Sequence, residues 1–464
     1  MNTFTPFKEK MEAAGVSAAA IMSFERNFKI LEAGEATDIT EESIEPVKAL
    51  PELGDVALTG EEFDPELLAQ TVVIKLNGGL GTSMGLQKAK SLLEVKDGST
   101  FLDVIVEQIS YLRETTGAKV KFLLMNSFST SEDTMRHLET YEDRGFAERS
   151  EVELMQNQIP KIDLESMTPA EHSSNPSLEW CPPGHGDLYP AIAGSGWLDN
   201  LLESGVKYAF VSNSDNLGAV LDASILRYFA ENELPFLMEV TRRTEADKKG
   251  GHLAVRKDDG QLLLREVAQC PDEDLGEFQN IEKYQYFNTN SLWINLESLK
   301  AELESQGGVL PLPVIVNKKT IDPRDKKSTA VYQLETAMGA AIECFKGAGA
   351  ICVPRSRFAP VKTTADLFAL RSDAYETTVD GRVALVAERD GKPPVVVLSD
   401  QYKLVDSLEG LGVPSLKQAD KLTLSGPVRF ADAVQIRGTV SLTNEKPETV
   451  WVANGVYRDE DVVL

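Results

Sequence analysis

The sequence has 464 residues, enough for two or three domains with a large buried core. Its formal net charge of −26 at pH 7 argues against nucleic acid or an anionic membrane surface as a partner. The sequence has no run of 18 apolar residues, no signal-peptide pattern at its N-terminus and no C-x-x-C pair among its four cysteines. These features predict a cytoplasmic protein with reduced thiols and no membrane span.

The first part of the chain, residues 1–70, is predicted to be a mostly helical N-terminal segment. Apolar residues follow a helical spacing from Met11 to Ile30. Prolines at positions 46, 51 and 65 then interrupt regular structure. We expect helices joined by loops here.

A β-branched apolar run at 72–76 predicts a buried strand, and a glycine-rich loop follows it with the sequence LNGGLGTSMG at 76–85. Glycines let backbone N–H groups approach a bulky anion, so such a loop at the end of a strand is typical of phosphate binding. The spacing fits neither G-x-G-x-x-G nor the Walker A pattern. A purely structural tight turn is the alternative.

Residues 71–375 alternate strand-like runs, at 72–76, 120–125, 208–211 and 236–240, with helical patterns. This alternation predicts a Rossmann-like α/β domain with a mixed, mostly parallel sheet. The strand at 208–211 runs into Asp215 at its carboxyl end, where such folds hold metal ions. One carboxylate is enough for Mg²⁺, which takes other oxygens from phosphates and water. An Asx turn is the alternative for Asp215.

Two other segments are candidates for chemistry. PPGHGD at 182–187 places His185 between glycines, although a lone histidine is more often a packing or surface residue. Nine lysines and arginines between Lys318 and Lys362 concentrate positive charge where an anion could use it. A solvated basic loop at 318–327 is an equally good interpretation.

The last segment, residues 376–464, has a different pattern. Apolar pairs two residues apart recur every six residues from Leu422 to Leu442, and another pair follows at Val450 and Val452. A six-residue period is typical of a parallel β-helix, because each short strand forms one side of a coil. An antiparallel meander would also alternate, but it would not keep the six-residue phase. An unpaired coil end must be capped or used for association.

Several motifs together resemble the eukaryotic-type UTP–glucose-1-phosphate uridylyltransferases (UDP-glucose pyrophosphorylases). They are the loop at 76–85 with Lys90-Ser91, MQNQIPKI at 155–162, PPGHGD at 182–187, SNSDNLG at 212–218 and VPRSRFAPVK at 353–362. The sequence departs from the family's C-K-G-P at 86–89, which reads LQKA here, and Ser214 replaces a common isoleucine. The resemblance runs in register from about Leu76 to Asp373, and the C-terminal hexads also fit it.

The resemblance implies a GT-A-like nucleotidyltransferase core and a C-terminal left-handed parallel β-helix. It implies catalytic roles for Lys90, Lys362 and Asp215, with Asp215 as the ligand of a Mg²⁺ cofactor. Gln156 would read uracil, since an amide can donate to a carbonyl and accept from the ring N–H. The nucleotide-binding residues implied are Leu76, Asn77, Gly78, Gly79, Gly81, Thr82, Met125, Gln156, Gly184 and Asn213. The sugar-binding residues implied are His185, Gly251, Glu266, Asn288 and Asn290.

The implied reaction converts UTP and glucose 1-phosphate into UDP-glucose and pyrophosphate, with these small molecules as partners and a homo-oligomer formed through the β-helix as a further expectation. A pyrophosphorylase for UDP-N-acetylhexosamine, or for several sugars, is the nearest alternative. A nicotinamide dehydrogenase is disfavoured by the loop spacing. A non-catalytic nucleotide-sugar-binding scaffold would not need Lys90, Asp215 and Lys362 together.

Overall fold

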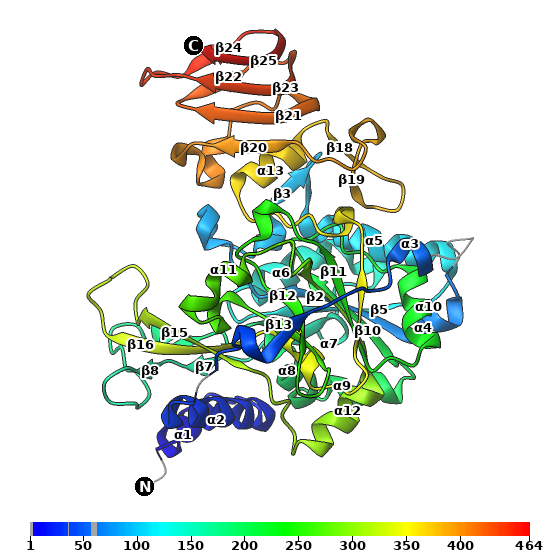
Figure 1. Cartoon of the computed structure of the whole chain (residues 1–464), viewed down its shortest axis with the longest axis vertical. Helices are drawn as coiled ribbons and strands as arrows, with labels where there is room; N and C mark the ends of the chain where they lie inside the picture. The colour runs from blue at the N-terminus through cyan, green and yellow to red at the C-terminus, as the bar shows by residue number, and fades with distance from the viewer. Residues whose placement is uncertain (1–2, 36, 57–62) are drawn as a thin grey trace.

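The computed structural model describes residues 3–35, 37–56 and 63–464 (Figure 1). A large mixed sheet lies in the middle of the molecule, helices cover it, and the C-terminal strands form smaller sheets at one end. The predicted mixed α/β core is confirmed.

The large sheet has ten strands among the described residues, and its main path runs β1-β12-β14-β10-β2-β5-β6. β2 is buried on both faces, because its side chains alternate between two apolar cores. Val73 packs in the core that holds α5 (Phe101–Thr116) and α10 (Ala223–Glu231). Val72 and Ile74 pack in the other core, which holds α8 (Leu188–Gly194), α9 (Trp197–Glu203) and α12 (Leu296–Ser305). The strands are β1 (Ile44–Pro46), β2 (Thr71–Asn77), β5 (Lys121–Asn126), β6 (Glu153–Met155), β10 (Tyr208–Asn213), β11 (Phe236–Arg242), β12 (His252–Arg256), β13 (Leu262–Arg265), β14 (Tyr286–Asn295) and β17 (Gly349–Cys352).

The parallel part of this sheet is formed by β10, β2, β5 and β6, in that order. In this register Asn77 lies opposite Asn126, and Asn126 lies opposite Met155. The four strands therefore end at one edge. Ligands of open α/β sheets bind outside the carboxyl ends of parallel strands, so this edge is where a site is expected. β14 pairs antiparallel with both β10 and β11, and builds the other part of the sheet.

Local sequence signals define the helices that cover the sheet. α5 (Phe101–Thr116) begins with a capping box between Thr100 and Asp103 and ends at Gly117, whose backbone is left-handed. α10 begins at an Asp222 side chain that accepts from two backbone N–H groups. The other helices here are α3 (Leu53–Val56), α4 (Pro65–Ala69), α6 (Ser131–Leu138), α7 (Arg149–Val152), α8 (Leu188–Gly194), α9 (Trp197–Glu203), α10 (Ala223–Glu231), α11 (Leu275–Phe278), α12 (Leu296–Ser305) and α13 (Thr364–Arg371).

The N-terminal segment is mostly helical in its described part. The helical spacing from Met11 to Ile30 is divided between α1 (Thr5–Ala13) and α2 (Ala18–Ala33), because Gly15 has a positive φ and Ser17 caps α2. Phenylalanines from both helices pack against the small sheets β7–β9 and β15–β16–β8. The strands of these sheets are β7 (Ile159–Pro160), β8 (Ile162–Asp163), β9 (Trp180–Cys181), β15 (Val314–Thr320) and β16 (Ala330–Thr336).

The C-terminal strands pair in parallel, which rules out the antiparallel meander. Leu422 and Leu424 lie beside Val440 and Leu442, and Val428 lies beside Val450. The apolar side chains of these pairs are almost all buried, as the hexad pattern requires. These strands are β20 (Val395–Leu398), β21 (Ser415–Ser425), β22 (Val428–Phe430), β23 (Val434–Thr443), β24 (Val450–Val452) and β25 (Gly455–Val463), and two short hairpins, β3 (Glu94–Lys96) with β4 (Ser99–Thr100) and β18 (Tyr375–Thr377) with β19 (Val383–Leu385), complete the set.

The core beneath α5 continues into the C-terminal strands. Phe368 of α13 packs against Phe430 of β22, with ring centroids 6.2 Å apart. The Asp373 carboxylate accepts from the backbone N–H of Leu416 at 2.8 Å. The strands at the top of Figure 1 are thus joined to the α/β core through side chains of both parts. Division of the chain at residues 70 and 375 stays a prediction.

Candidate active site

The glycine-rich loop folds back toward the residues that follow it. The backbone N–H of Lys90 donates to the carbonyl of Gly79 at 3.1 Å. Gly81 has φ +64, and a Cβ there would lie 2.8 Å from Leu86 Cδ1 and 3.3 Å from Lys90 Cγ. A side chain at position 81 would therefore strain the backbone and displace its neighbours. Leu86 belongs to the LQKA departure, so that segment closes the loop through an apolar contact.

Lys90 and Asp215 form an ion pair at the edge where the parallel strands end. Lys90 Nζ lies 2.5 Å from Asp215 Oδ2, and the two side chains are only 15% and 19% exposed. Lys90 comes from the loop after β2, whereas Asp215 comes from the loop after β10. The fold thus joins two of the three predicted catalytic residues directly.

The third, Lys362, is brought to the same place by a clamp between two loops. The backbone N–H of Val361 donates to the carbonyl of Asp215 at 3.1 Å. The buried Asn216 side chain donates to the carbonyl of Arg357 at 3.0 Å and accepts from the backbone N–H of Ala359 at 3.1 Å. The Lys362 side chain itself is exposed. Asn216 is therefore a positioning residue that the motif analysis did not single out.

We predict that Asn216→Ala lowers kcat by about 10- to 100-fold, as expected when a residue that orients functional groups is lost. The KM for UTP should change less, because neither Lys90 nor the glycine-rich loop is touched. Steady-state kinetics test this, with Asn232→Ala as the control, since the exposed side-chain amide of Asn232 donates to the carbonyl of Tyr228 at the end of a surface helix. A raised KM with an intact kcat would contradict the positioning role.

Two arginines of the predicted basic concentration are not free to bind an anion. Arg357 is buried and its guanidinium donates to both carboxylate oxygens of Glu239, at 2.8 Å each. Arg355 forms a similar two-point pair with Asp247, at 2.8 and 2.9 Å. The five basic residues at 318–327 lie on the β15–β16 hairpin, which projects from the sheet in Figure 1. The positive charge that the sequence concentrates at 318–362 is thus mostly paired with carboxylates inside the protein or distributed along a hairpin.

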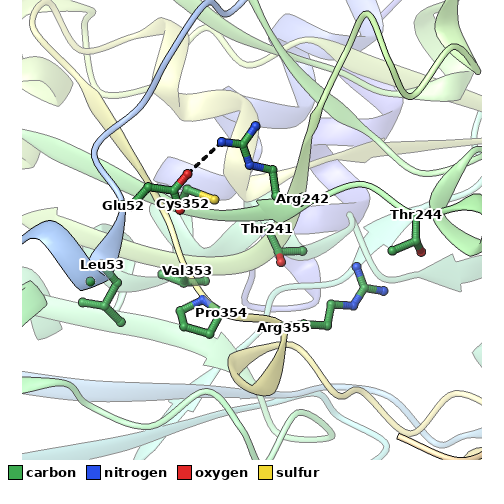
Figure 2. A pocket seen from close by; sticks show the side chains of 10 residues that line it. Glu52, Leu53, Thr241, Arg242, Thr244, Cys352, Val353, Pro354 and Arg355 are labelled. Carbon is green, nitrogen blue, oxygen red and sulfur yellow. Dashed lines mark hydrogen bonds and ion pairs between the residues drawn. The ribbon is translucent and has the colours of Figure 1, made fainter. Parts of the chain in front are cut away.

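Arg355 also lines a hollow of about 320 Å³ beside β11 and β17. Figure 2 shows Arg242 paired with Glu52, with Cys352 at the end of β17 and Pro354 in the segment that follows it. Among the described residues that line this hollow, none is a predicted site residue. The candidate site lies elsewhere, at the loops after β2, β5, β6 and β10.

Gln156, predicted to read the base, sits between two glycines. Its Nε2 donates to the carbonyl of Gly184 at 3.0 Å, and a Cβ on Gly78 would lie 2.5 Å from its Oε1. Met125 is buried beside Leu76 in the register of β5 and β2. The structure therefore gathers Leu76, Gly78, Met125, Gln156 and Gly184, which come from four separate segments.

We predict that Gln156→Ala narrows the preference for UTP over CTP by about tenfold, roughly the effect of one lost hydrogen bond. Competition assays with the two nucleotides measure this preference, and Gln306→Ala, at the exposed end of α12, is the control. Unchanged discrimination would mean that another group reads the base.

The PPGHGD loop is fixed against the end of β16. Gly184 has φ +80, and a Cβ there would lie 2.5 Å from the carbonyl of Thr336. His185 Nδ1 accepts from the backbone N–H of Met338 at 3.0 Å, which assigns the proton of the neutral ring to Nε2. Desolvation lowers the pKa of His185 to about 4, so the imidazole stays neutral at physiological pH and can donate from Nε2.

Asp187 connects this loop to the base-reading segment. Its carboxylate accepts from the backbone N–H of Asn157 at 2.6 Å and from the Asn157 amide at 3.1 Å. Burial raises the pKa of Asp187 to about 7, against the opposing effect of these hydrogen bonds. Because Asn157 directly follows Gln156, Asp187 orients the predicted uracil reader. The motif contained Asp187, but only the fold shows its partner.

The predicted sugar-binding residues also come together. A Cβ on Gly251 would lie 2.6 Å from the Glu266 carboxyl group, and the backbone N–H of Asn288 donates to the carbonyl of Gly251 at 3.3 Å. Asn290 has a left-handed backbone, φ +56, and its side chain accepts from the Asn288 amide at 3.0 Å. Burial raises the pKa of Glu266, and the nearby Lys362 opposes that shift. Lys362 thus lies between the Asp215 loop and the predicted sugar side.

The side chain of one predicted nucleotide-binding residue, Asn77, is buried and hydrogen-bonded within the protein. Asn77 is buried, donates to Asn126 at 2.7 Å and Thr134 at 3.0 Å, and accepts from Ser214 at 3.3 Å. Any contact of Asn77 with a nucleotide would therefore use its backbone. Thr82 and Gly79 are exposed on the loop, and Asn213 is half-buried at the end of β10.

The described residues contain no cluster of three or more His, Cys, Asp or Glu side chains suited to a metal ion.

None of the described helices is long and apolar enough to span a membrane. One short 3₁₀ turn lies within the glycine-rich loop, at Thr82–Met84, and a second follows it, at Lys90–Leu92, where a dinucleotide-binding loop would lead into a helix. This arrangement counts further against a dehydrogenase.

The Lys90–Asp215 pair lies beside a glycine-rich loop at the carboxyl edge of parallel strands, which is the arrangement expected of an α/β nucleotidyltransferase. The family model described as UTP–glucose-1-phosphate uridylyltransferase matches residues 21–437. The chain belongs to this family.

Named relatives and solved structures support the same family assignment. The chain is 42% identical over 405 residues to the UTP–glucose-1-phosphate uridylyltransferase of Hordeum vulgare, covering 85% of this chain and 82% of that protein. A UDP-glucose pyrophosphorylase variant from Leishmania major, solved in complex with UDP-glucose, is 47% identical with a TM-score of 0.93 and full coverage of both chains. A UDP-glucose phosphorylase from Trypanosoma brucei is 50% identical with a TM-score of 0.90, again with full coverage of both chains.

Proposed function

We propose that this protein transfers the uridylyl group of UTP to glucose 1-phosphate and releases pyrophosphate, in a reversible reaction. Membership of the family supports this activity. The structural observation that carries it is the Lys90–Asp215 pair under the glycine-rich loop, with Lys362 on the adjoining segment. A non-catalytic scaffold would have no use for these three groups together.

The chemistry needs positioning and positive charge more than a base. The attacking phosphate oxygen of glucose 1-phosphate is already ionised at neutral pH, so no residue has to remove a proton. What opposes the reaction is the repulsion between anions in an acidic protein. Fixed cations that bring the reactants in line and stabilise the charge on the α-phosphate are the main source of rate in such transfers.

The position of each predicted site residue suggests its role in this reaction. The glycine-rich loop and Lys90 would bind the UTP phosphates. The exposed Lys362, between the Asp215 loop and Glu266, would hold the attacking sugar phosphate and the charge that develops on the α-phosphate. The neutral His185, the buried amide of Asn288 and the half-buried amide of Asn290 would bind sugar hydroxyls, which need hydrogen bonds rather than charge.

A Mg²⁺ cofactor is part of the proposal. Asp215 offers a hard carboxylate oxygen at the sheet edge, beside the half-buried Asn213, and this donor set fits an ion that takes its remaining oxygens from phosphates and water. Bound there, Mg²⁺ would supply neutralising charge at the α-phosphate. Its carboxylate ligand is paired with Lys90 in this structure, so the two cations would share or exchange Asp215.

The activity and its sugar specificity can be tested in one assay. Pyrophosphate release would be measured with UTP, Mg²⁺ and a panel of sugar 1-phosphates. We expect glucose 1-phosphate to be the best substrate. A clear preference for N-acetylhexosamine 1-phosphates would support the alternative pyrophosphorylase, and binding of UDP-glucose without turnover would support the scaffold.

We also propose that the C-terminal strands form a left-handed parallel β-helix, that the protein is cytoplasmic, and that it associates through the last coil. β25 pairs with β23 on one side, and the last coil exposes Trp451, Val456 and Val463 at 61%, 51% and 72%. Exposed apolar groups on a strand at the end of a stack favour pairing with another copy.

We predict that replacing both Val456 and Val463 by lysine lowers the molar mass measured by light scattering without changing kcat, because the predicted site lies in the α/β core. Val379→Lys is the matched control, since Val379 is 92% exposed outside these strands. A parent protein that is already a single chain in solution, or a mass unchanged by the double substitution, would argue against association through this coil.

A further inference from the structure

A cavity of about 360 Å³ lies on the α5 side of the sheet. Its apolar wall includes Ile109 and Leu112 of α5 and Leu221 in the segment before α10. Lys75 of β2 also lines it, although the Lys75 side chain is almost completely buried. The cavity is in the size range of small-molecule sites, which are mostly apolar with a few placed polar groups.

The Lys75 ammonium has only neutral hydrogen-bond acceptors. Nζ donates to Ser212 Oγ at 2.8 Å and to the carbonyl of Ala219 at 2.6 Å, and it lies 5.8 Å from the centre of the Phe210 ring. No carboxylate among the described residues forms an ion pair with it. Buried charges in proteins are usually paired, because desolvation penalises the charged form. Burial accordingly lowers the pKa of Lys75 to about 7.

The other charged groups near the cavity are already engaged. Arg357 repels Lys75 but is bound to Glu239, whose charge favours the ammonium without touching it. Asp222 caps α10 with two hydrogen bonds of 3.0 Å and lies 3.6 Å from Arg357. At the turn between β18 and β19, Asp380 pairs with Arg382 at 2.6 Å. Lys75 is thus the one charged lining group, in the described part of the chain, without an oppositely charged partner.

We propose that this cavity binds a small carboxylate with an apolar body, such as an aromatic acid, whose carboxylate pairs with Lys75 while its body packs against Ile109, Leu112 and Leu221. A single negative charge suits one ammonium at the end of an apolar wall. A phosphate dianion would bring a second negative charge, for which the described lining residues offer no second unpaired cation, and it would lose more hydration on burial. Since Lys75 holds the carbonyl of Ala219, four residues from Asp215, an occupant here contacts the support of the Asp215 loop.

Calorimetry on the full chain with 2-naphthoate, and with neutral 2-naphthamide as the matched probe, tests the proposal. We expect naphthoate to bind at least tenfold more tightly than naphthamide. Lys75→Met, which removes the charge and keeps the length, should reduce this ratio to about one. Leu112→Trp, which fills the cavity, should abolish binding of both probes.

Proton uptake provides a readout specific to Lys75. A carboxylate beside the amine raises its pKa, so above pH 7 the largely neutral amine must take up a proton when naphthoate binds. Titrations at pH 8.5 in buffers with different ionisation heats should show uptake of about one proton, falling toward zero at pH 6. This measurement uses the unmodified protein and remains decisive if Lys75→Met does not fold. Absence of uptake at pH 8.5, an unchanged preference in Lys75→Met, or undiminished binding to Leu112→Trp would each overturn the proposal.

Discussion

Replacing Lys362 by alanine is expected to lower kcat by about 10²–10³-fold, the usual effect of losing a charge that acts on a transition state. The segment that carries Lys362 is fixed to the Asp215 loop by the hydrogen bond from Val361, yet its side chain is exposed and close to Glu266. A lysine is a compact charge with three donors, which suits a phosphate group whose charge is shifting. The affinity for UTP should fall much less.

The comparison that decides this assignment is with Lys90→Ala. Lys90 lies under the glycine-rich loop and pairs with Asp215, so its loss should weaken UTP binding more directly. Steady-state kinetics and UTP titration on both variants separate the two roles, with Lys326→Ala on the exposed hairpin as the control. If Lys362→Ala changes only the affinity for UTP, Lys362 anchors the ground state and the catalytic assignment is wrong.

Asp215→Asn is expected to lower turnover by about 10²–10³-fold while keeping the fold. The substitution is isosteric, but a neutral amide is a far weaker ligand for Mg²⁺, and several kcal/mol of charge stabilisation correspond to that change in rate. It also removes the anion that pairs with Lys90 at 2.5 Å, so a change in UTP affinity should accompany the loss of turnover.

Two measurements check this prediction. Turnover is followed as a function of Mg²⁺ concentration, and Mn²⁺ binding is followed by magnetic resonance, which reports on the metal site without catalysis. Asp432→Asn is the matched control, because Asp432 is exposed in the C-terminal segment. Near-normal turnover at saturating Mg²⁺ would remove Asp215 from the metal site.

The parts of the fold that could be predicted are those determined by neighbouring residues. The β-branched run at 72–76 forms β2, and the hexads from Leu422 to Leu442 form buried, parallel-paired strands, because both patterns depend on which face each side chain occupies. The helical spacing from Met11 to Ile30 gave one stretch where the structure has two helices. There Gly15 and the Ser17 cap outweigh the apolar period.

The assembly of the site could be predicted only in part. The motifs identified Lys90, Asp215 and Lys362 as candidates. Asn216, in contrast, holds the site together through backbone atoms of Arg357 and Ala359, which lie far along the chain. A sequence pattern does not show which backbone atoms a side chain will contact. The positive charge before residue 363 was misleading for a related reason. Arg355 and Arg357 are neutralised by carboxylates that only the tertiary structure brings to them.

The stacked C-terminal strands contain one corner where chain length is free to vary. The chain is longer between Val428 and its partner Val450 than between Leu422 and its partner Val440, yet the pairing resumes in phase with Phe430 beside Val452. The additional residues lie at the exposed 445–449 corner, and Asn444 secures its base by donating to the carbonyls of Pro427 and Glu448. Because residues 445–449 lie outside the hydrogen-bonded strands, this corner is a suitable attachment point for a peptide tag or a fluorescent label. Such an attachment should leave the parallel C-terminal strands and the distant α/β core undisturbed.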